Sequence, residues 1–133
     1  MATRTAAQQR NEAREAYDAF MKECPTNQLL ARISDKWVSL IVSALGEQSP
    51  MRYSDLGRKI PGVSQKMLTQ TLRSLERDGL VARTVTASVP VRVDYELTAL
   101  GRNLCCLLTA VKEWAEKHFD EVDEARTRYD ETA

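Results

Sequence analysis

The sequence has little of what most enzymes and metal sites require. It contains one histidine, His118, and three cysteines, Cys24, Cys105 and Cys106, of which two are adjacent. Adjacent cysteines on a helix project about 100° apart, so they lack the spacing of a zinc site. The chain also has no glycine loop of the phosphate-binding kind and no serine elbow. These absences argue against an enzyme, and they predict no catalytic residue, no metal and no cofactor.

Long apolar runs are scarce as well. No stretch approaches the roughly 20 apolar residues that a membrane-spanning helix needs, and the N-terminal segment lacks the apolar core of a secretory signal. We therefore expect a cytoplasmic protein with no membrane partner. At 133 residues the chain is long enough to bury the core of a normal single domain without disulfides or metals.

The chain has no net charge, because 19 Lys and Arg balance 19 Asp and Glu. The charges are nevertheless unevenly distributed. Residues 52–92 carry eight basic against three acidic side chains, a net of +5, whereas residues 93–133 carry five against ten, a net of −5. A basic middle segment beside an acidic tail makes a polarised molecule, and its positive part is suited to a nucleic acid.

The basic segment contains the pattern of a helix-turn-helix. Residues 53–60 form a short helical pattern, Pro61-Gly62 marks a turn, and residues 64–78 form a second helical pattern. Ser64 is suited to cap the start of the second helix, and Gly79 can take the left-handed conformation that ends it. In a helix-turn-helix, the second helix enters the major groove of DNA.

The second helix has two faces of different chemistry. Leu68, Leu72 and Leu75 recur at helical spacing and predict a packed face. The other face holds side chains that hydrogen-bond base edges and phosphates, with arginine suited to guanine and glutamine to adenine. Taken alone, such a face could equally be a solvated amphipathic surface. The expected DNA-binding residues of this helix are Ser64, Gln65, Lys66, Thr69, Gln70, Arg73 and Arg77.

Two strand patterns follow the second helix. Residues 80–86 are rich in β-branched side chains, and residues 91–97 alternate between apolar and polar positions across a tip at residues 87–90. We predict a hairpin with Arg83 and Arg92 near its tip, where a wing contacts the sugar-phosphate backbone or the minor groove. The expected fold is therefore mainly α with a small β-wing, a winged helix-turn-helix.

Helical patterns flank this core. Ala13, Tyr17 and Phe20 indicate an amphipathic helix that ends before Cys24. An apolar stripe then runs from Leu29 to Ala44, ending near Gly46 with a break around Ser34-Asp35, and we expect its Trp37 in the core. We divide the chain into an N-terminal arm and helix (1–23), the winged core (24–98) and a C-terminal helix with an acidic tail (99–133).

Thr98 is placed to cap a long last helix that has more apolar positions than one small domain can bury. We expect this helix to pair with the same helix of a second subunit in a two-fold homodimer, with help from the N-terminal helix. A two-fold protein would read a pseudo-palindromic operator in double-stranded DNA. The expected interface residues are Phe20, Leu104, Leu107, Leu108, Val111 and Trp114.

A series of short motifs follows in one order over roughly residues 24–115. They are Cys24-Pro25, Leu29-Leu30, Ile33, Lys36-Trp37, Leu40-Ile41, Arg52–Leu56, Ile60–Gln70, Leu75–Val81, Val89–Val91, Tyr95–Thr98 and Leu100-Gly101. In order and spacing they resemble the HxlR-type family of bacterial transcriptional regulators, relatives of the MarR-like winged helices. One departure is Asp35, where the family usually has glycine. The resemblance implies a homodimeric DNA-binding regulator that commonly controls a neighbouring gene.

Cys24 has two interpretations. It lies at a predicted helix start, close to Lys22, which favours a thiolate, while Glu23 opposes one. From these residues a structural role and a reactive role both remain open. The resemblance adds that, in several family members, a cysteine at the position of Cys24 senses oxidants or small electrophiles. Cys105 and Cys106 are expected as small buried side chains of the last helix, and His118 as a surface or interface residue.

Two functions from different classes compete. The first is a homodimeric, sequence-specific DNA-binding transcriptional regulator with a thiol response at Cys24. The alternative is a winged-helix protein-interaction module that has lost DNA binding. A protein-binding surface would be expected to carry aromatic anchors in place of exposed Lys and Arg. The basic helix and wing therefore favour the first.

Overall fold

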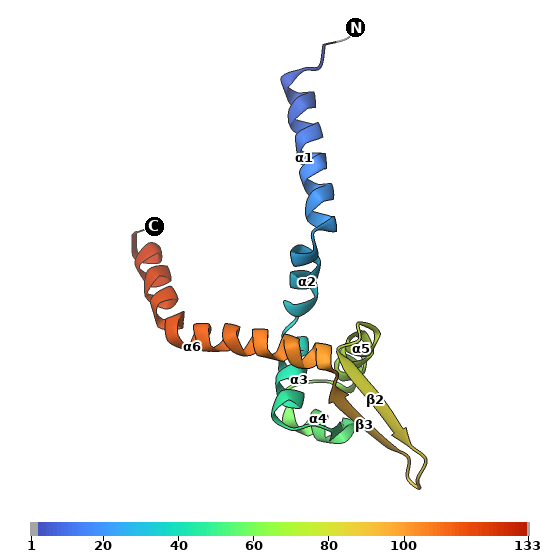
Figure 1. Ribbon diagram of the computed structural model, residues 1–133. Helices are drawn as coiled ribbons and strands as arrows, with labels where there is room; N and C mark the ends of the chain where they lie inside the picture. Colours follow the sequence, from blue (N-terminus) through green and yellow to red (C-terminus); the bar gives the residue numbers. More distant parts are fainter. Residues whose placement is uncertain (1–2, 133) are drawn as a thin grey trace. The chain divides into compact units, whose positions relative to one another are not determined.

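In the computed structural model, which describes residues 3–132, the chain divides into two compact units (Figure 1). The first unit ends at Lys36 and the second begins at Trp37. The first consists of two helices, α1 (Ala6–Glu23) and α2 (Pro25–Ile33). The end of α2 at Ile33 confirms the break that was expected around Ser34-Asp35.

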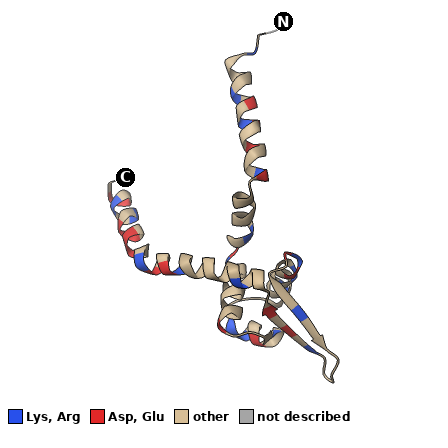
Figure 2. Cartoon of the chain, viewed as in Figure 1, with Lys and Arg blue, Asp and Glu red and all other residues tan. Residues whose placement is uncertain are grey.

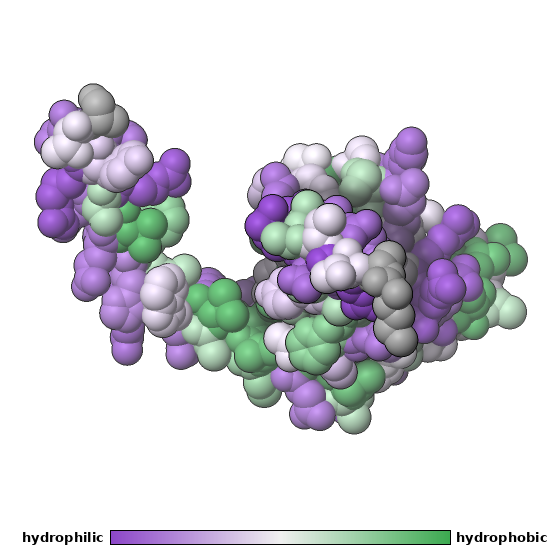
Figure 3. Space-filling model, turned by 90° about the horizontal axis from the view of Figure 1, so that it is seen from above, coloured by the Kyte–Doolittle hydropathy of each residue, from purple (hydrophilic) through white to green (hydrophobic). Residues whose placement is uncertain are grey.

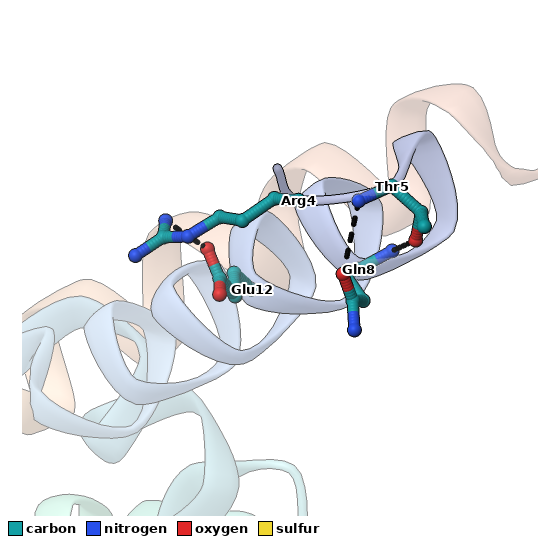
Figure 4. Close-up of polar contacts among 4 residues, drawn as sticks. All are labelled: Arg4, Thr5, Gln8 and Glu12. Carbon is teal, nitrogen blue, oxygen red and sulfur yellow. Dashed lines mark hydrogen bonds and ion pairs between the residues drawn. The ribbon is translucent and has the colours of Figure 1, made fainter. Parts of the chain in front are cut away.

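The start of α1 is fixed by its own side chains. Oγ1 of Thr5 accepts a hydrogen bond from the backbone N–H of Gln8 at 3.1 Å, and Oε1 of Gln8 accepts one from the backbone N–H of Thr5 at 2.9 Å (Figure 4). Arg4 and Glu12 add an exposed ion pair at 2.6 Å. The reciprocal cap satisfies two backbone N–H groups, whereas an ion pair in solvent adds little to stability. This helix start is therefore set locally.

Cys24 ends one helix and begins the next. Its extended backbone, with φ −63° and ψ 122°, makes it both the C-cap of α1 and the N-cap of α2. Pro25 follows at the first position of α2, where a missing N–H costs nothing. Nδ2 of Asn27 donates to the carbonyl oxygen of Met21 at 2.8 Å. That bond satisfies a terminal carbonyl of α1 and ties the two helices together.

The second unit is a winged helix. Its elements are α3 (Lys36–Glu47), β1 (Met51–Arg52), α4 (Tyr53–Lys59), α5 (Gln65–Arg77), β2 (Val81–Thr86), β3 (Arg92–Leu97) and α6 (Ala99–Thr132). The first residue of α3, Lys36, is the last residue of the first unit. Within residues 3–132, the strands form an antiparallel sheet in the order β1-β3-β2. The β2–β3 hairpin projects from the helices as a wing (Figure 1). The predicted mainly α fold with a small β-wing is confirmed.

The core of the second unit is built from aliphatic faces of α3, α4 and α5. Its most deeply buried large side chains are Ile41, Val42, Leu45, Leu56, Leu68, Leu72 and Leu75. The predicted packed face of the second helix is thus confirmed. Trp37 is half-buried, because it lies in the first turn of α3 at the edge of the core, where full burial begins at Val38. The expectation that Trp37 is a core residue is wrong for the single chain.

The end of α5 has the geometry expected from its glycine. Gly79 has a φ of +76°, and the backbone N–H of Leu80 donates to the carbonyl oxygen of Leu75 at 2.9 Å. The N–H of Gly79 donates to the carbonyl oxygen of Glu76 at 3.0 Å. These two bonds form a Schellman motif, which satisfies terminal carbonyls and turns the chain into β2.

Thr98 joins this turn to the start of α6. Its Oγ1 donates to the carbonyl oxygen of Gly79 at 2.6 Å and accepts from the N–H of Gly101 at 3.0 Å. Its own N–H donates to the carbonyl oxygen of Leu80 at 3.1 Å. The helix start passes so close to the turn that a Cβ built on Gly101 would lie 2.0 Å from the oxygen of Leu80. Thr98 therefore caps α6 as predicted, and Gly101 permits the approach.

Much of α6 is exposed in the single chain. Only its first turns reach the core, through the buried residues Gly101, Leu104 and Leu108. Beyond them, hydrophobic side chains lie among hydrophilic ones along the helix (Figure 3). Within residues 3–132, no helix is long and apolar enough to cross a membrane.

We expect Gly101→Ala to lower the free energy of unfolding by about 1–3 kcal/mol, the usual cost of overpacking, because the new Cβ would clash with backbone. Urea unfolding followed by circular dichroism would measure the change. Gly57→Ala is the matched control, since its Cβ would meet Cδ2 of Leu68 at an ordinary 3.7 Å. That variant should be neutral or slightly stabilising in its helix. Equal stability of the two variants would contradict the close approach.

Candidate nucleic-acid interface

The candidate interface begins at the first turn of α5. Ser64 has extended backbone, and its Oγ accepts a hydrogen bond from the N–H of Met67 at 3.1 Å. The cap predicted from sequence is thus present. The hydroxyl hydrogen of Ser64 is left for another acceptor at an exposed position.

The side chains of α5 that were predicted to bind DNA lie toward solvent. Among them Thr69 is half-buried, and the exposed residues are Gln65, Lys66, Gln70, Arg73 and Arg77. Figure 2 shows Lys and Arg in blue on α5 and on the hairpin, and Asp and Glu in red on β3. The helix therefore buries its leucines and presents hydrogen-bonding groups and positive charge to solvent. The predicted division of its two faces is confirmed.

A tyrosine that we did not single out in the sequence also belongs to this surface. Tyr53, the first residue of α4, has its Oη 2.9 Å from Oγ1 of Thr69, and it donates to the carbonyl oxygen of Gln65 at 3.1 Å. Tyr53 precedes Thr69 by 16 residues. No local pattern joins positions so far apart, so only the packing of α4 against α5 shows the contact.

The two arginines of the wing lie in different places. Arg83 pairs with Tyr95 in the inner half of the hairpin, so the expectation that it lies near the tip is wrong. Three residue pairs lie between Arg83 and the tip of the hairpin, and the last of them is Thr86 opposite Arg92. Arg83 instead lines a hollow of about 440 Å³ together with Arg73, Thr69 and Tyr53. The inner wing and α5 thus contribute to one surface.

Arg92 lies near the tip, as expected. Its Nε donates to Oδ2 of Asp94 at 2.9 Å, so part of its charge is balanced on its own strand. Arg92 also borders a second hollow, of about 710 Å³, with Arg52 and Ser54 from the start of α4. Arg52 is thus a further basic candidate that sequence patterns did not single out, since its position opposite Asp94 depends on the pairing of β1 with β3.

Cys24 lies outside the second unit, at the N-terminus of α2. The backbone N–H groups of Asn27 and then of Thr26, at the start of α2, favour the thiolate and hold the pKa of the Cys24 thiol below its ordinary value. Desolvation acts in the opposite direction and is outweighed. Helix N-termini favour a thiolate in this way. The N-cap position therefore provides a physical reason for reactivity that the neighbouring charges in the sequence left undecided.

The other cysteines differ from one another. Cys105 is half-buried, with its Sγ 3.9 Å from the carbonyl oxygen of Val42, whereas Cys106 is exposed. The expectation that both are buried is wrong for Cys106, because adjacent helical positions point to different sides and only one meets α3. His118 lies against Trp114, with ring centroids 5.0 Å apart, and its Nδ1 is 3.8 Å from Oε1 of Glu121.

The expected interface residues fall into two groups. Leu104 and Leu108, which were expected at the dimer interface, are buried in the core of their own chain. Leu107, Val111 and Trp114 are 48%, 56% and 59% exposed, and Phe20 on α1 is 65% exposed. At about 100° per residue, Leu107, Val111 and Trp114 lie on one side of α6. We call these three residues the α6 stripe.

Comparisons with known proteins agree with this arrangement. Residues 32–123 match the HxlR-like helix-turn-helix family. The chain is 42% identical over 103 residues to the HTH-type transcriptional regulator YtfH of Escherichia coli (strain K12), which covers 77% of this chain and 81% of that protein.

Solved structures of similar proteins have the same fold. The transcriptional regulator YtfH from Salmonella typhimurium aligns with a TM-score of 0.71 and 38% identity, covering 81% of this chain and 96% of its own. The redox regulator HypR in its reduced form aligns with a TM-score of 0.69 and 36% identity, covering 76% and 99%. The chain therefore belongs to the HxlR-like helix-turn-helix family and is a transcriptional regulator of the helix-turn-helix type.

Proposed function

We propose that this regulator is a homodimer that binds specific sequences in double-stranded DNA. The observation that carries the proposal is the exposed face of α5, where Gln65, Lys66, Gln70 and Arg73 surround Thr69 at the surface. A helix of this kind fits the major groove, where glutamine and arginine form bidentate pairs with adenine and guanine. The side chains that would read bases are therefore mainly those of the first turns of α5.

The remaining predicted contact residues would position the protein on the duplex. Ser64 and Arg77 lie at the two ends of α5, and Arg83 and Arg92 lie on the wing. Contacts to phosphate fix register and orientation without reading sequence. We assign this role to these four residues and add Arg52, which borders the same hollow as Arg92.

A second copy of the chain is the partner that we propose for the exposed apolar residues. The α6 stripe and Phe20 are large hydrophobic side chains with more than a third of their surface in solvent. Exposed apolar side chains gathered along one helix face are typical of an interface. Two copies of α6 packed about a two-fold axis would cover the stripe and hold two copies of α5 in fixed positions. In this organisation residues 24–98 bind DNA and residues 99–133 dimerise.

Selection of bound sequences from a random DNA pool tests the proposed function. We expect a pseudo-palindromic motif with half-site centres about one helical turn apart, roughly 10 bp, or a multiple of that. If the dimer makes about 6–10 phosphate contacts, affinity should fall by around 10³- to 10⁵-fold between about 50 and 200 mM salt. A folded protein that selects no motif and responds little to salt would favour the protein-interaction alternative.

Single substitutions separate base reading from positioning in the same assay. Arg73→Ala or Gln70→Ala should cost about 1–3 kcal/mol and relax the preference at particular base pairs. Arg92→Ala should weaken binding to all sequences alike and lower the salt slope by about one. Arg128→Ala, at an exposed position far along α6, is the control and should change neither. A shifted base preference in Arg92→Ala, with none in Arg73→Ala, would reverse the assigned roles.

Val111→Glu tests the dimer, because it places a charge in the middle of the α6 stripe. We expect a folded monomer in sedimentation equilibrium, with a large loss of DNA affinity, since one subunit makes only half of the contacts. Thr109→Glu adds the same charge about 160° around the helix, at an exposed position, and should leave the dimer intact. If Val111→Glu remains a dimer, the interface lies elsewhere.

We further propose that Cys24 makes DNA binding sensitive to oxidants and small electrophiles. The depressed pKa of its thiol supports the proposal, and the relative HypR is named a redox regulator. Because Cys24 joins α1 to α2, an adduct on its sulfur would place new bulk at this junction and disturb it. DNA affinity would then change without any change in a base contact.

The proposal predicts how the alkylation rate of Cys24 depends on pH. A depressed pKa keeps Cys24 as thiolate to lower pH, so iodoacetamide should modify it with a pH midpoint below that of an ordinary cysteine thiol. Cys106, which is exposed, serves as the internal control for alkylation. Mass spectrometry gives both rates. In the wild type, oxidant should weaken DNA binding and reductant should restore it. Cys24→Ser should bind DNA but lose this response to oxidant. A response that survives Cys24→Ser would place the sensor elsewhere.

A further inference from the structure

Tyr53 makes hydrogen bonds to two groups on the recognition helix α5. Its Oη donates to the carbonyl oxygen of Gln65 at 3.1 Å and lies 2.9 Å from Oγ1 of Thr69. The phenol spans the first turn of the helix, where the side chains proposed to read bases begin. We refer to Thr69, Tyr53 and the Gln65 carbonyl group as the hydroxyl relay.

The number of hydrogens determines the direction of the relay. A phenol carries one hydrogen, and Tyr53 uses it to donate to the carbonyl oxygen of Gln65. The bond between the two hydroxyl groups must then be donated by Thr69. Thr69 also has only one hydroxyl hydrogen, so its Oγ1 retains lone pairs and has nothing left to donate. The relay thus turns a residue that could donate or accept into one that only accepts.

Thr69 lies at a surface where a ligand could contact its hydroxyl oxygen. It is half-buried, and it lines the 440 Å³ hollow beside Arg73 and Arg83. The two arginines are donors only, because a guanidinium has no acceptor atom. Around this hollow, Thr69 therefore supplies an acceptor next to two donors.

We propose that the hydroxyl relay makes Thr69 a specificity-determining acceptor for the amino group of adenine or cytosine in the major groove. The inference rests on the DNA-binding function proposed above and names one of its base preferences. In the major groove, adenine presents its N6 amino group and cytosine its N4 amino group, whereas guanine and thymine present acceptor oxygens. An acceptor-only Thr69 is matched to the first two bases and repelled by the others. Tyr53 acts through Thr69 as a positioning residue.

Random-pool selection with four proteins tests this: wild type, Thr69→Ser, Thr69→Val and Tyr53→Phe. The wild type should prefer adenine or cytosine at one position, and Thr69→Ser should retain that preference because it keeps the hydroxyl group. Thr69→Val should lose it, with a fall in affinity for the selected site of roughly 2- to 12-fold, the equivalent of one hydrogen bond. Tyr53→Phe frees the Thr69 hydrogen and should relax the same position.

A double substitution separates the relay from simple anchoring of the helix. If Tyr53 acts through Thr69, Tyr53→Phe in the Thr69→Val background should cause no further change at that position. If Tyr53 only anchors α5 through the Gln65 carbonyl, Tyr53→Phe should weaken all sequences alike in both backgrounds, and the proposal is overturned. Circular dichroism of each variant checks folding. If Tyr53→Phe does not fold, the comparison of Thr69→Ser with Thr69→Val still tests whether the Thr69 hydroxyl group sets the base preference.

The outcomes also distinguish this inference from the proposed function. A clear wild-type motif that stays the same in Thr69→Val and Tyr53→Phe overturns the relay and leaves DNA binding intact. A preference for guanine or thymine opposite Thr69, lost in Thr69→Val, overturns the acceptor assignment. A wild-type protein that selects no motif overturns both proposals together.

Discussion

The hydroxyl group of Thr98 connects two helices of the second unit at one point. It donates to the carbonyl oxygen of Gly79 at the end of α5 and accepts from the N–H of Gly101 at the start of α6. One side chain thus joins the proposed recognition helix, the base of the wing and the long C-terminal helix. The contact also needs the glycine at position 101, because the carbonyl oxygen of Leu80 occupies the space of a side chain there.

Several polar groups of this protein combine a structural and a chemical role. Ser64 begins α5 by accepting from the N–H of Met67, and its position puts it at the edge of the surface that we assign to DNA. Cys24 is the N-cap residue of α2, and the backbone N–H groups at this helix start lower the pKa of its thiol. Tyr53 ties α4 to α5 through the Gln65 carbonyl group and the Thr69 hydroxyl group, and in our proposal it restricts how that hydroxyl is used. In each case the local fold restricts the chemistry of the side chain.

Local patterns were enough to predict most of the fold. The start of α5 at Ser64, its end at Gly79 and the cap of α6 at Thr98 are decided within a few residues, so short-range hydrogen bonds specify them. The two faces of α5 follow from the helical period alone, which places its leucines on one side. The wing also follows from alternation and a tip of turn residues. Helices and strands with strong periodicity leave few alternatives.

What the sequence by itself determined was therefore the set of elements, their caps and the chemical character of each face. The tertiary structure decided which positions share a surface: it placed Arg83 beside Arg73, buried Leu104 and Leu108, and exposed Cys106. The physical reason is that periodicity gives the direction of a side chain relative to its own element and carries no information about what covers that side. The contact of Tyr53 with Thr69 depends on the packing of α4 against α5, and only the folded chain specifies it.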